Sequence, residues 1–380
     1  MYDYNLDIYQ NSLTLVILSF GYLLIIILGV KTREDILKIT LLYLWHTIFS
    51  IIYFLYSLSN TADAKQYFRV SKLGSDFRFY PGSNFIYSVS SPFSKGFDAN
   101  YLNTTLIFSL IGSFGLVFLY LAIKPYLRNL QVLWSTILFI PTMSFWSSGL
   151  GKDAISFFSV CLLIYTVTTN RKKILLIPLS FFSMFMVRPH VASMIAVSYL
   201  IYFIIQSRVH IVLKLIILPI LATAILMSIG FVQQYVGLED ASLDSLNEYV
   251  DGRQSVNRTG GSSLDITSMG YPMQMFTYIF RPLPFDAHSS VALITSFENT
   301  ALLLVVLYIL LKSKASLKNF FKNENLWLFI YAFLTCTMLA ITTANLGIAT
   351  RQKWMFMPVV LYLLIYAYHD YTVKKNKGYV

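Results

Sequence analysis

Long stretches without a charged residue recur along this 380-residue chain. Several of them run for about 16–22 residues, the length of α-helix that crosses a hydrocarbon core roughly 30 Å thick. Backbone polar groups in lipid must be bonded within the chain, so only helices and closed barrels span a membrane. Charged residues make up 12% of the chain, about half the share in soluble domains. The sequence therefore predicts an all-α polytopic membrane protein.

The apolar stretches predict about 11 transmembrane helices in one integral membrane domain, 1–380. Two long loops, about 58–101 and 232–287, separate some of them. The expected spans are 13–30, 38–57, 102–123, 131–148, 154–169, 174–188, 191–206, 211–231, 288–311, 326–343 and 354–370.

The distribution of cations predicts the orientation of these spans. One alternate set of short loops, together with the C-terminal tail, carries 17 of the 29 Lys and Arg residues. Basic loops remain on the cytoplasmic side of a membrane. We therefore expect the C-terminus in the cytoplasm, the N-terminus outside, and both long loops on the outer face.

Other features exclude several classes of protein. The net charge of +11 is explained by basic loops facing an anionic leaflet, so it does not predict nucleic-acid binding. Cys161 and Cys336 both lie in apolar runs, where cysteine is typically a packing residue. The chain has no cysteine–histidine metal set, no phosphate-binding Walker loop and no GxSxG nucleophile elbow.

Cations on the outer face need an explanation, because they oppose the usual charge bias. Five of them lie in the first long loop, and another five stand at the outer ends of spans. The second group comprises Lys152, Arg188, Arg281, Arg351 and Lys353.

Gly151-Lys152-Asp153 occupies a short turn between two spans. Glycine lets the backbone approach a ligand closely, and a carboxylate in the first helical turn favours the helix N-terminus. One interpretation is a helix cap with a snorkelling lysine. The other is an anion site, where Lys152 and helix-terminal amides meet a phosphate. We expect Asp153 to orient Lys152 and cap the helix.

Arg188-Pro189-His190 forms a second short outer turn. Arg188 would act as a fixed charge or a phosphate fork, whereas His190 can exchange protons near neutral pH. Arg281 also precedes a proline at a membrane boundary, and Arg351 precedes the last span. Arg253 and Arg258, in the second long loop, are weaker candidates of the same kind.

Carboxylates supply the candidate bases. Asp63 and Tyr67 open the first outer loop and would share one face of a helix, being four residues apart. Glu298 lies about three turns inside a span, and ionisable groups within the membrane are functional candidates. His46 is also intramembrane, and its expected role is packing.

These motifs together resemble the multispan bacterial polysaccharide polymerases of the Wzy and EpsG-like group, which are related to GT-C-type glycosyltransferases. The resemblance rests on Asp63-x-x-x-Tyr67, Gly151-Lys152-Asp153, Arg188-Pro189-His190 and Arg351. As architecture it covers most of the chain, and as motif only about 20 residues.

The resemblance implies a GT-C-like fold and polymerisation of oligosaccharide repeat units carried on undecaprenyl pyrophosphate. The reaction would occur at the outer (periplasmic) face of the bacterial inner membrane, in capsule, O-antigen or lipopolysaccharide biosynthesis. A chain-length regulator and a flippase of the same pathway are the implied protein partners. Such a reaction needs stabilisation of the leaving pyrophosphate and a base for the attacking hydroxyl.

We expect the cations Lys152, Arg188, Arg281 and Arg351 at the pyrophosphates, with Arg253 and Arg258 as lesser candidates. Asp63 is the first choice as base, followed by His190 and Glu298; Tyr67, Asp153 and Gly151 would support them. A single Asp63 without a neighbouring acid gives no support for a metal cofactor. The alternatives are a single-sugar GT-C transferase with a polyprenyl-phosphate donor and a flippase for lipid-linked sugar.

Overall fold

The computed structural model describes residues 7–74, 77–169, 173–206, 209–216, 218–219, 223, 252, 263–266, 268–287 and 289–377. Throughout these ranges the regular elements are helical, and one isolated β-bridge joins Ser263 to Asn345. Seven of the described helices are long and apolar enough to cross a membrane. The prediction of a polytopic helical membrane protein is thereby confirmed in its coarse form.

The chain separates into two compact units, Met1–Pro189 and His190–Val380. The expectation of one membrane domain over 1–380 stays a prediction, as do the count of 11 spans and their orientation.

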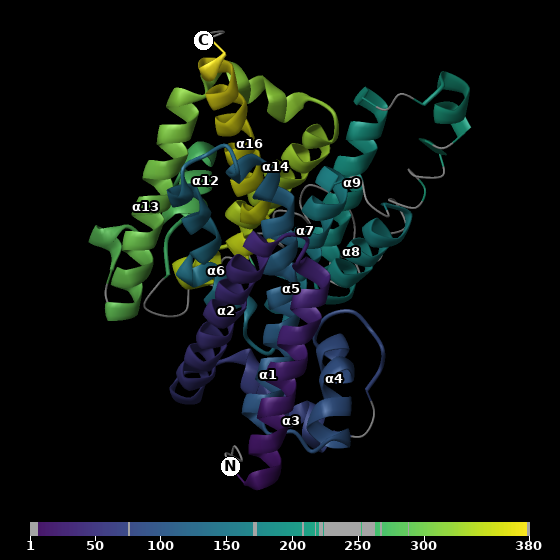
Figure 1. The fold of residues 1–380 in the computed structure, drawn as a ribbon, viewed down its shortest axis with the longest axis vertical. Helices are drawn as coiled ribbons and strands as arrows, with labels where there is room; N and C mark the ends of the chain where they lie inside the picture. The colour runs from purple at the N-terminus through teal and green to yellow at the C-terminus, as the bar shows by residue number, and fades with distance from the viewer. Residues whose placement is uncertain are drawn as a thin grey trace. The chain divides into compact units, whose positions relative to one another are not determined.

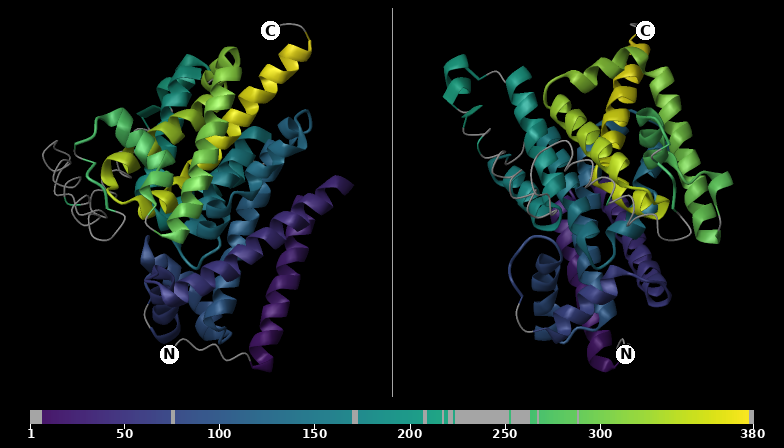
Figure 2. Two further views of the ribbon diagram at one scale, coloured as in Figure 1. Left: turned by 90° about the vertical axis from the view of Figure 1, so that its left-hand side faces the viewer. Right: turned by 180° about the vertical axis from the view of Figure 1, so that it is seen from behind.

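Unit 1 (Met1–Pro189) contains four of the seven candidate spans. Its helices are α1 (Ile8–Gly29), α2 (Arg33–Ser59), α3 (Asp63–Leu73), α4 (Ser83–Ser91), α5 (Tyr101–Leu127), α6 (Pro141–Ser147), α7 (Lys152–Thr169) and α8 (Lys173–Val187). The candidate spans among them are α1, α2, α5 and α7. Figure 2 shows α1 and α2 converging at the turn that joins them.

Helix α5 is the centre of unit 1, where it packs against α1, α2 and α7. Within its most apolar window 72% of the residues are buried, against 17% for α1. The remaining apolar surface of α1 is exposed in the protein, as expected for a helix that faces lipid. Close approach at Gly112 brings α5 against α6, since a Cβ there would lie 2.1 Å from the carbonyl oxygen of Ser147.

The first long loop is mostly helical. Helices α3 and α4 lie side by side (Figure 1), and a short π-helical turn, Pro92–Gly96, follows α4. Their apolar residues join a buried cluster with Tyr53 of α2 and Tyr101 of α5. The loop therefore packs against α2 and α5 through its own hydrophobic side chains.

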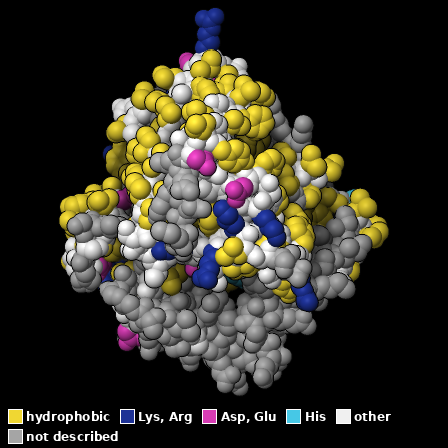
Figure 3. All heavy atoms as spheres, turned by 90° about the horizontal axis from the view of Figure 1, so that it is seen from below, with side chains coloured by type: hydrophobic (Ala, Val, Ile, Leu, Met, Phe, Trp, Pro, Cys, Tyr) yellow, Lys and Arg dark blue, Asp and Glu magenta, His cyan; other side chains and the backbone are white. Residues whose placement is uncertain are grey.

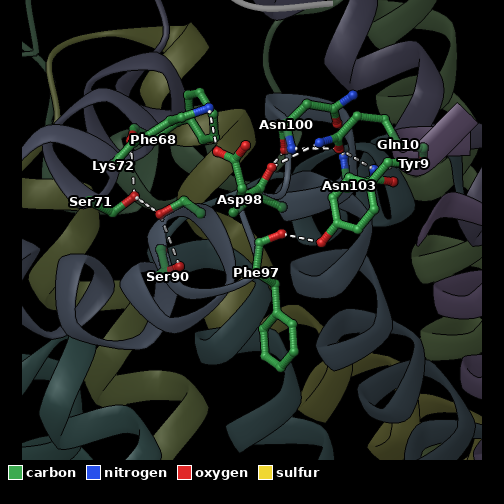
Figure 4. A network of polar contacts seen from close by, with 12 residues as sticks. Tyr9, Gln10, Phe68, Ser71, Lys72, Ser90, Phe97, Asp98, Asn100 and Asn103 are labelled. Carbon is green, nitrogen blue, oxygen red and sulfur yellow. Dashed lines mark hydrogen bonds and ion pairs between the residues drawn. The ribbon is translucent and has the colours of Figure 1, made fainter. Parts of the chain in front are cut away.

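A buried polar latch joins the start of α1 to the start of α5 (Figure 4). The Gln10 amide oxygen accepts hydrogen bonds from the Asn100 backbone (2.9 Å) and the Asn103 side chain (2.9 Å). Its amide nitrogen donates to the Asp98 carbonyl at 2.8 Å. At the other end of α5, Asp35 accepts from Tyr120 at 2.6 Å and from Lys124 at 2.8 Å. Polar side chains thus hold α5 at both ends.

One of the expected spans differs from the structure, and a second lies largely outside the described residues. The stretch 131–148 is a 3₁₀ segment, Val132–Phe139, followed by the short helix α6. Pro141 starts α6, and a proline lacks the backbone N–H that would continue a preceding helix. The stretch 211–231 lies largely outside the described residues, as does most of 232–262.

Unit 2 (His190–Val380) contains the other three candidate spans, α9, α13 and α14. Its described helices are α9 (Pro189–Gln206), α12 (Tyr271–Phe280), α13 (Ser290–Lys312), α14 (Glu324–Thr342), α15 (Leu346–Gln352) and α16 (Met357–Asn376). Helix α16 corresponds to the expected span 354–370 and packs against α13 and α14. Tyr331 of α14 donates to the Met355 carbonyl at 2.7 Å, which ties the start of α16 to α14.

Candidate functional site

The glycine turn before α7 is pressed against two aromatic rings. A Cβ at Gly149 would lie 2.4 Å from Cζ of Tyr53, and one at Gly151 would lie 3.2 Å from Cε2 of Tyr67. Contacts under 3.0 Å force a shift, so Gly149 in particular leaves no room for a side chain. The turn ends at Lys152, the first residue of α7. Two rings therefore fix the place where Lys152 and Asp153 begin the helix.

Asp153 and Arg188 form an ion pair between the start of α7 and the end of α8. Nη2 of Arg188 lies 2.7 Å from Oδ1 of Asp153, and their side chains are only 11% and 13% exposed. Nε of Arg188 is buried without a hydrogen-bond partner. We expected Asp153 to orient Lys152, which stays a prediction; in the structure the Asp153 carboxylate pairs with Arg188.

Helix α3 places Asp63 and Tyr67 as their spacing predicted. Asp63 is the exposed first residue of α3, and Tyr67, one turn later, is buried. The Tyr67 ring lies 5.9 Å from that of Tyr87 on α4. Burial raises the pKa of Tyr87, and the negative charge of Asp63 adds to this effect. The Asp63 carboxylate is therefore close enough to Tyr87 to affect its pKa. Helix α3 contacts the glycine turn at Gly151 through the Tyr67 ring.

One cluster joins these motifs, which are distant in the sequence. The backbone N–H of Gly82 donates to the Met186 carbonyl at 2.8 Å, linking the loop before α4 to the end of α8. Tyr67, Leu150 and Met186 belong to the same buried apolar cluster. We call this arrangement the unit 1 site. It comprises Asp63, Tyr67, Gly151, Lys152, Asp153 and Arg188.

Exposed cations surround this end of unit 1. Arg69, Arg78 and Lys95 of the first long loop are exposed, and Lys72 forms an ion pair with the exposed Asp98 at 3.2 Å. Figure 3, viewed from the end that α3 and α4 occupy in Figure 1, shows several Lys and Arg side chains on this face. Anions approaching this face meet a positive surface, which raises association rates.

Unit 2 contains the other candidates, and the structure pairs one of them. Arg281 contacts Asp286 through Nε, at 2.9 Å, and through Nη2. Asp286 also accepts from the Leu283 backbone at 2.8 Å, which closes a tight turn. The hydrogen bond to Asp286 is the main cause of the raised pKa of Arg281. We call residues 281–286 the Arg281 turn.

Lys353 is one of the five cations at span ends, but it is not among the predicted pyrophosphate-binding residues. Its side chain is 1% exposed, and Nζ donates to the Asn299 amide oxygen at 2.6 Å. The Asn299 amide nitrogen donates to the Pro282 carbonyl at 3.1 Å. Burial lowers the pKa of Lys353 to about 8, and the negative charge of Glu298 opposes this shift.

Glu298 therefore lies within electrostatic reach of Lys353, on helix α13. Arg351 is half-buried on α15, two residues before Lys353. His190 is the half-buried second residue of α9, and its Pro189 neighbour ends unit 1. Arg253 and Arg258 lie outside the described residues.

A small pocket in unit 2 gives no further candidate, and neither do metal ligands in the part of the chain that the structure describes. The pocket between α12, α14 and α15 encloses about 10 Å³, room for roughly one water molecule. Within the described ranges, no group of three or more His, Cys, Asp or Glu side chains is placed to hold a metal ion. Cys161 and Cys336 are buried free thiols.

Comparisons of the chain with protein-family models, with curated proteins and with solved structures find no match.

Proposed function

We propose that this protein is a membrane glycosyltransferase that polymerises oligosaccharide units carried on undecaprenyl pyrophosphate, at the outer face of the bacterial inner membrane. One observation carries the proposal. The unit 1 site contains one exposed carboxylate and two cations. Asp63 begins α3, one turn before the Tyr67 ring that lies against Gly151, while Lys152 begins α7 and Arg188 directly follows α8. A base and a pair of cations are the groups that glycosyl transfer from a pyrophosphate requires.

The reaction exchanges one bond to the anomeric carbon for another. A hydroxyl oxygen at the nonreducing end of the acceptor unit attacks the anomeric carbon of the growing chain. The bond from that carbon to the pyrophosphate oxygen breaks, and the lipid pyrophosphate leaves with the bonding electron pair. The hydroxyl proton passes to Asp63. Lys152 stabilises the negative charge that develops on the leaving oxygen.

Arg188 can bind either Asp153 or an arriving pyrophosphate. While Arg188 is paired with Asp153, the pair adds no net charge to the site. An arriving pyrophosphate offers oxygen acceptors in the geometry that a guanidinium binds best, and the unpartnered Nε of Arg188 can donate to it. In unit 2, Arg281, Arg351, His190 and Glu298 keep the pyrophosphate and proton-transfer roles proposed from the sequence.

The test is the product pattern made by the purified protein in nanodiscs from undecaprenyl-pyrophosphate-linked repeat units. A ladder of polymer lengths supports the proposal. A single addition identifies a single-sugar transferase, and movement of the lipid-linked unit across a vesicle membrane without a new bond identifies a flippase. Neither product nor movement would refute all three.

Variants then test the unit 1 site. Lys152→Ala and Asp63→Asn should each reduce polymer formation by at least 100-fold, in the range measured for the loss of charge stabilisation or of a general base. Lys95→Ala is the matched control for charge removal, because Lys95 is an exposed cation in the first long loop, outside the unit 1 site. Full polymer formation by both site variants would contradict the assignment of the residues.

A further inference from the structure

Lys353, Asn299 and the Arg281 turn form a continuous hydrogen-bonded chain within unit 2. Lys353 donates to Asn299, which in turn donates to the carbonyl of Pro282, the residue after Arg281. Lys353 is 1% exposed and Asn299 is 0% exposed. A ligand has no access to these two side chains, so their role must be exerted through the groups that they hold.

The chemistry of the two partners fixes the orientation of the Asn299 amide. An ammonium group can only donate hydrogen bonds, and a backbone carbonyl can only accept them. The amide oxygen must therefore face Lys353, and the amide nitrogen must face Pro282. Reversing the amide would leave both contacts unmade, in a place where no water reaches them.

The surroundings of Lys353 include a carboxylate and an aromatic ring. Glu298, next to Asn299 on α13, interacts electrostatically with Lys353, and the Lys353 ammonium also lies 5.4 Å from the centre of the Trp354 ring. The turn itself holds Arg281 against Asp286. One buried cation is thus connected by hydrogen bonds to the turn that holds Arg281.

We infer that Lys353 is a positioning residue for the proposed glycosyl transfer, holding the Arg281 turn through Asn299. The inference rests on the proposed function, because it concerns how one of the proposed site residues is placed. Lys353 itself contacts no substrate.

Three variants and one control separate the Lys353–Asn299 contact from the Asn299–Pro282 contact. Lys353→Met removes the donor and the charge, whereas Lys353→Gln keeps an N–H donor for Asn299 without the charge. Asn299→Asp keeps the shape and accepts from Lys353 but cannot donate to Pro282. Lys318→Met is the control, since Lys318 is an exposed residue of the 3₁₀ segment Lys314–Phe321.

The first measurement does not depend on catalysis. In the wild type the Leu283 backbone N–H donates a hydrogen bond to Asp286. Hydrogen exchange at this amide should become at least 10-fold faster in Lys353→Met and in Asn299→Asp. Lys353→Gln should lie between these variants and the wild type, and Lys318→Met should match the wild type. Unchanged exchange in both Lys353→Met and Asn299→Asp would overturn the inference, even if the wild type proves inactive.

The second measurement is polymer formation. Lys353→Met should lower kcat by about 10- to 100-fold, the range expected when one buried hydrogen bond is lost, with a smaller change in KM. Adding Lys353→Met to Arg281→Ala should lower activity little further, because both changes act on one turn. Additive losses, or a Lys353→Met enzyme as active as the wild type, would overturn the inference while leaving the proposed function in place.

Discussion

Asp153→Asn tests the charge balance of the unit 1 site most directly. The substitution keeps the shape of the side chain and one oxygen acceptor, but it removes the negative charge beside Arg188. The contact is 2.7 Å long and both side chains are nearly buried. Losing a charge-assisted hydrogen bond of this kind should lower the free energy of unfolding by about 2 kcal/mol. Either substitution leaves the remaining charge of the pair uncompensated, and Arg188→Ala should cost more, about 3 kcal/mol, because it also removes the packing of the arginine side chain.

The chain provides a matched control in the Lys72–Asp98 pair. That contact is 3.2 Å long, and its side chains are 27% and 74% exposed. Exposed pairs contribute roughly 0–1 kcal/mol, so Asp98→Asn should change stability little. Asp98 has a positive φ of 47°, a conformation that asparagine tolerates as well as aspartate does. The control therefore changes charge without adding backbone strain.

Equilibrium unfolding in mixed micelles, followed by tryptophan fluorescence at low and high salt, measures both pairs. Salt at about 1 M shortens the Debye length to roughly 3 Å and screens exposed charges. The cost of Asp153→Asn should persist at high salt, whereas any cost of Asp98→Asn should vanish. If the two substitutions cost the same, or if salt removes the cost of Asp153→Asn, the pair is not buried and the interpretation of its charge balance is wrong.

Two further predictions concern helix contact and protonation. Gly112→Ala should destabilise the protein by about 1–3 kcal/mol, because the new Cβ would lie 2.1 Å from the Ser147 carbonyl oxygen. Thermal unfolding measures this loss, with Gly96→Ala as the control, since no atom lies within 4 Å of a Cβ there. Equal stability of the two variants would contradict the prediction. Burial lowers the pKa of Lys353 from its ordinary value of 10.5 to about 8. Between these two pH values, the amine is protonated in the unfolded chain and neutral in the folded chain. The free energy of unfolding of the wild type, relative to that of Lys353→Met, should therefore rise with pH across this range, by up to about 3 kcal/mol. A difference that does not change with pH would show that burial does not shift the pKa of Lys353.

The sequence correctly predicted a candidate span where one helix covers a long uncharged run. Helices α1, α2, α5 and α7 follow from such runs, because a helix satisfies all its backbone hydrogen bonds within the segment, as lipid requires. The stretch 131–148 was predicted less well, since Pro141 is apolar enough to leave hydropathy high while it interrupts the helix.

The candidate site was predictable in its residues and not in its pairings. Lys152, Asp153 and Arg188 stand out as charges at span ends, which a single sequence shows. The partnership of Asp153 with Arg188 joins residues 35 apart, and only packing of α7 against α8 decides it. Lys353 reads as an ordinary interfacial cation before Trp354, because burial by α13 is a property of the tertiary structure.

The polar latch has a consequence for the order of synthesis. Gln10 leaves the ribosome long before its partners, which lie 88 to 93 residues further along the chain. At roughly 5–20 residues per second, the start of α1 waits about 5–20 s before Asp98, Asn100 and Asn103 exist. During that interval water or a lipid headgroup must satisfy the Gln10 amide, and we expect α1 to reach its final packing only after α5 has emerged. The amide that later joins α1 to α5 is thus expected to hold this end of α1 at the membrane surface first.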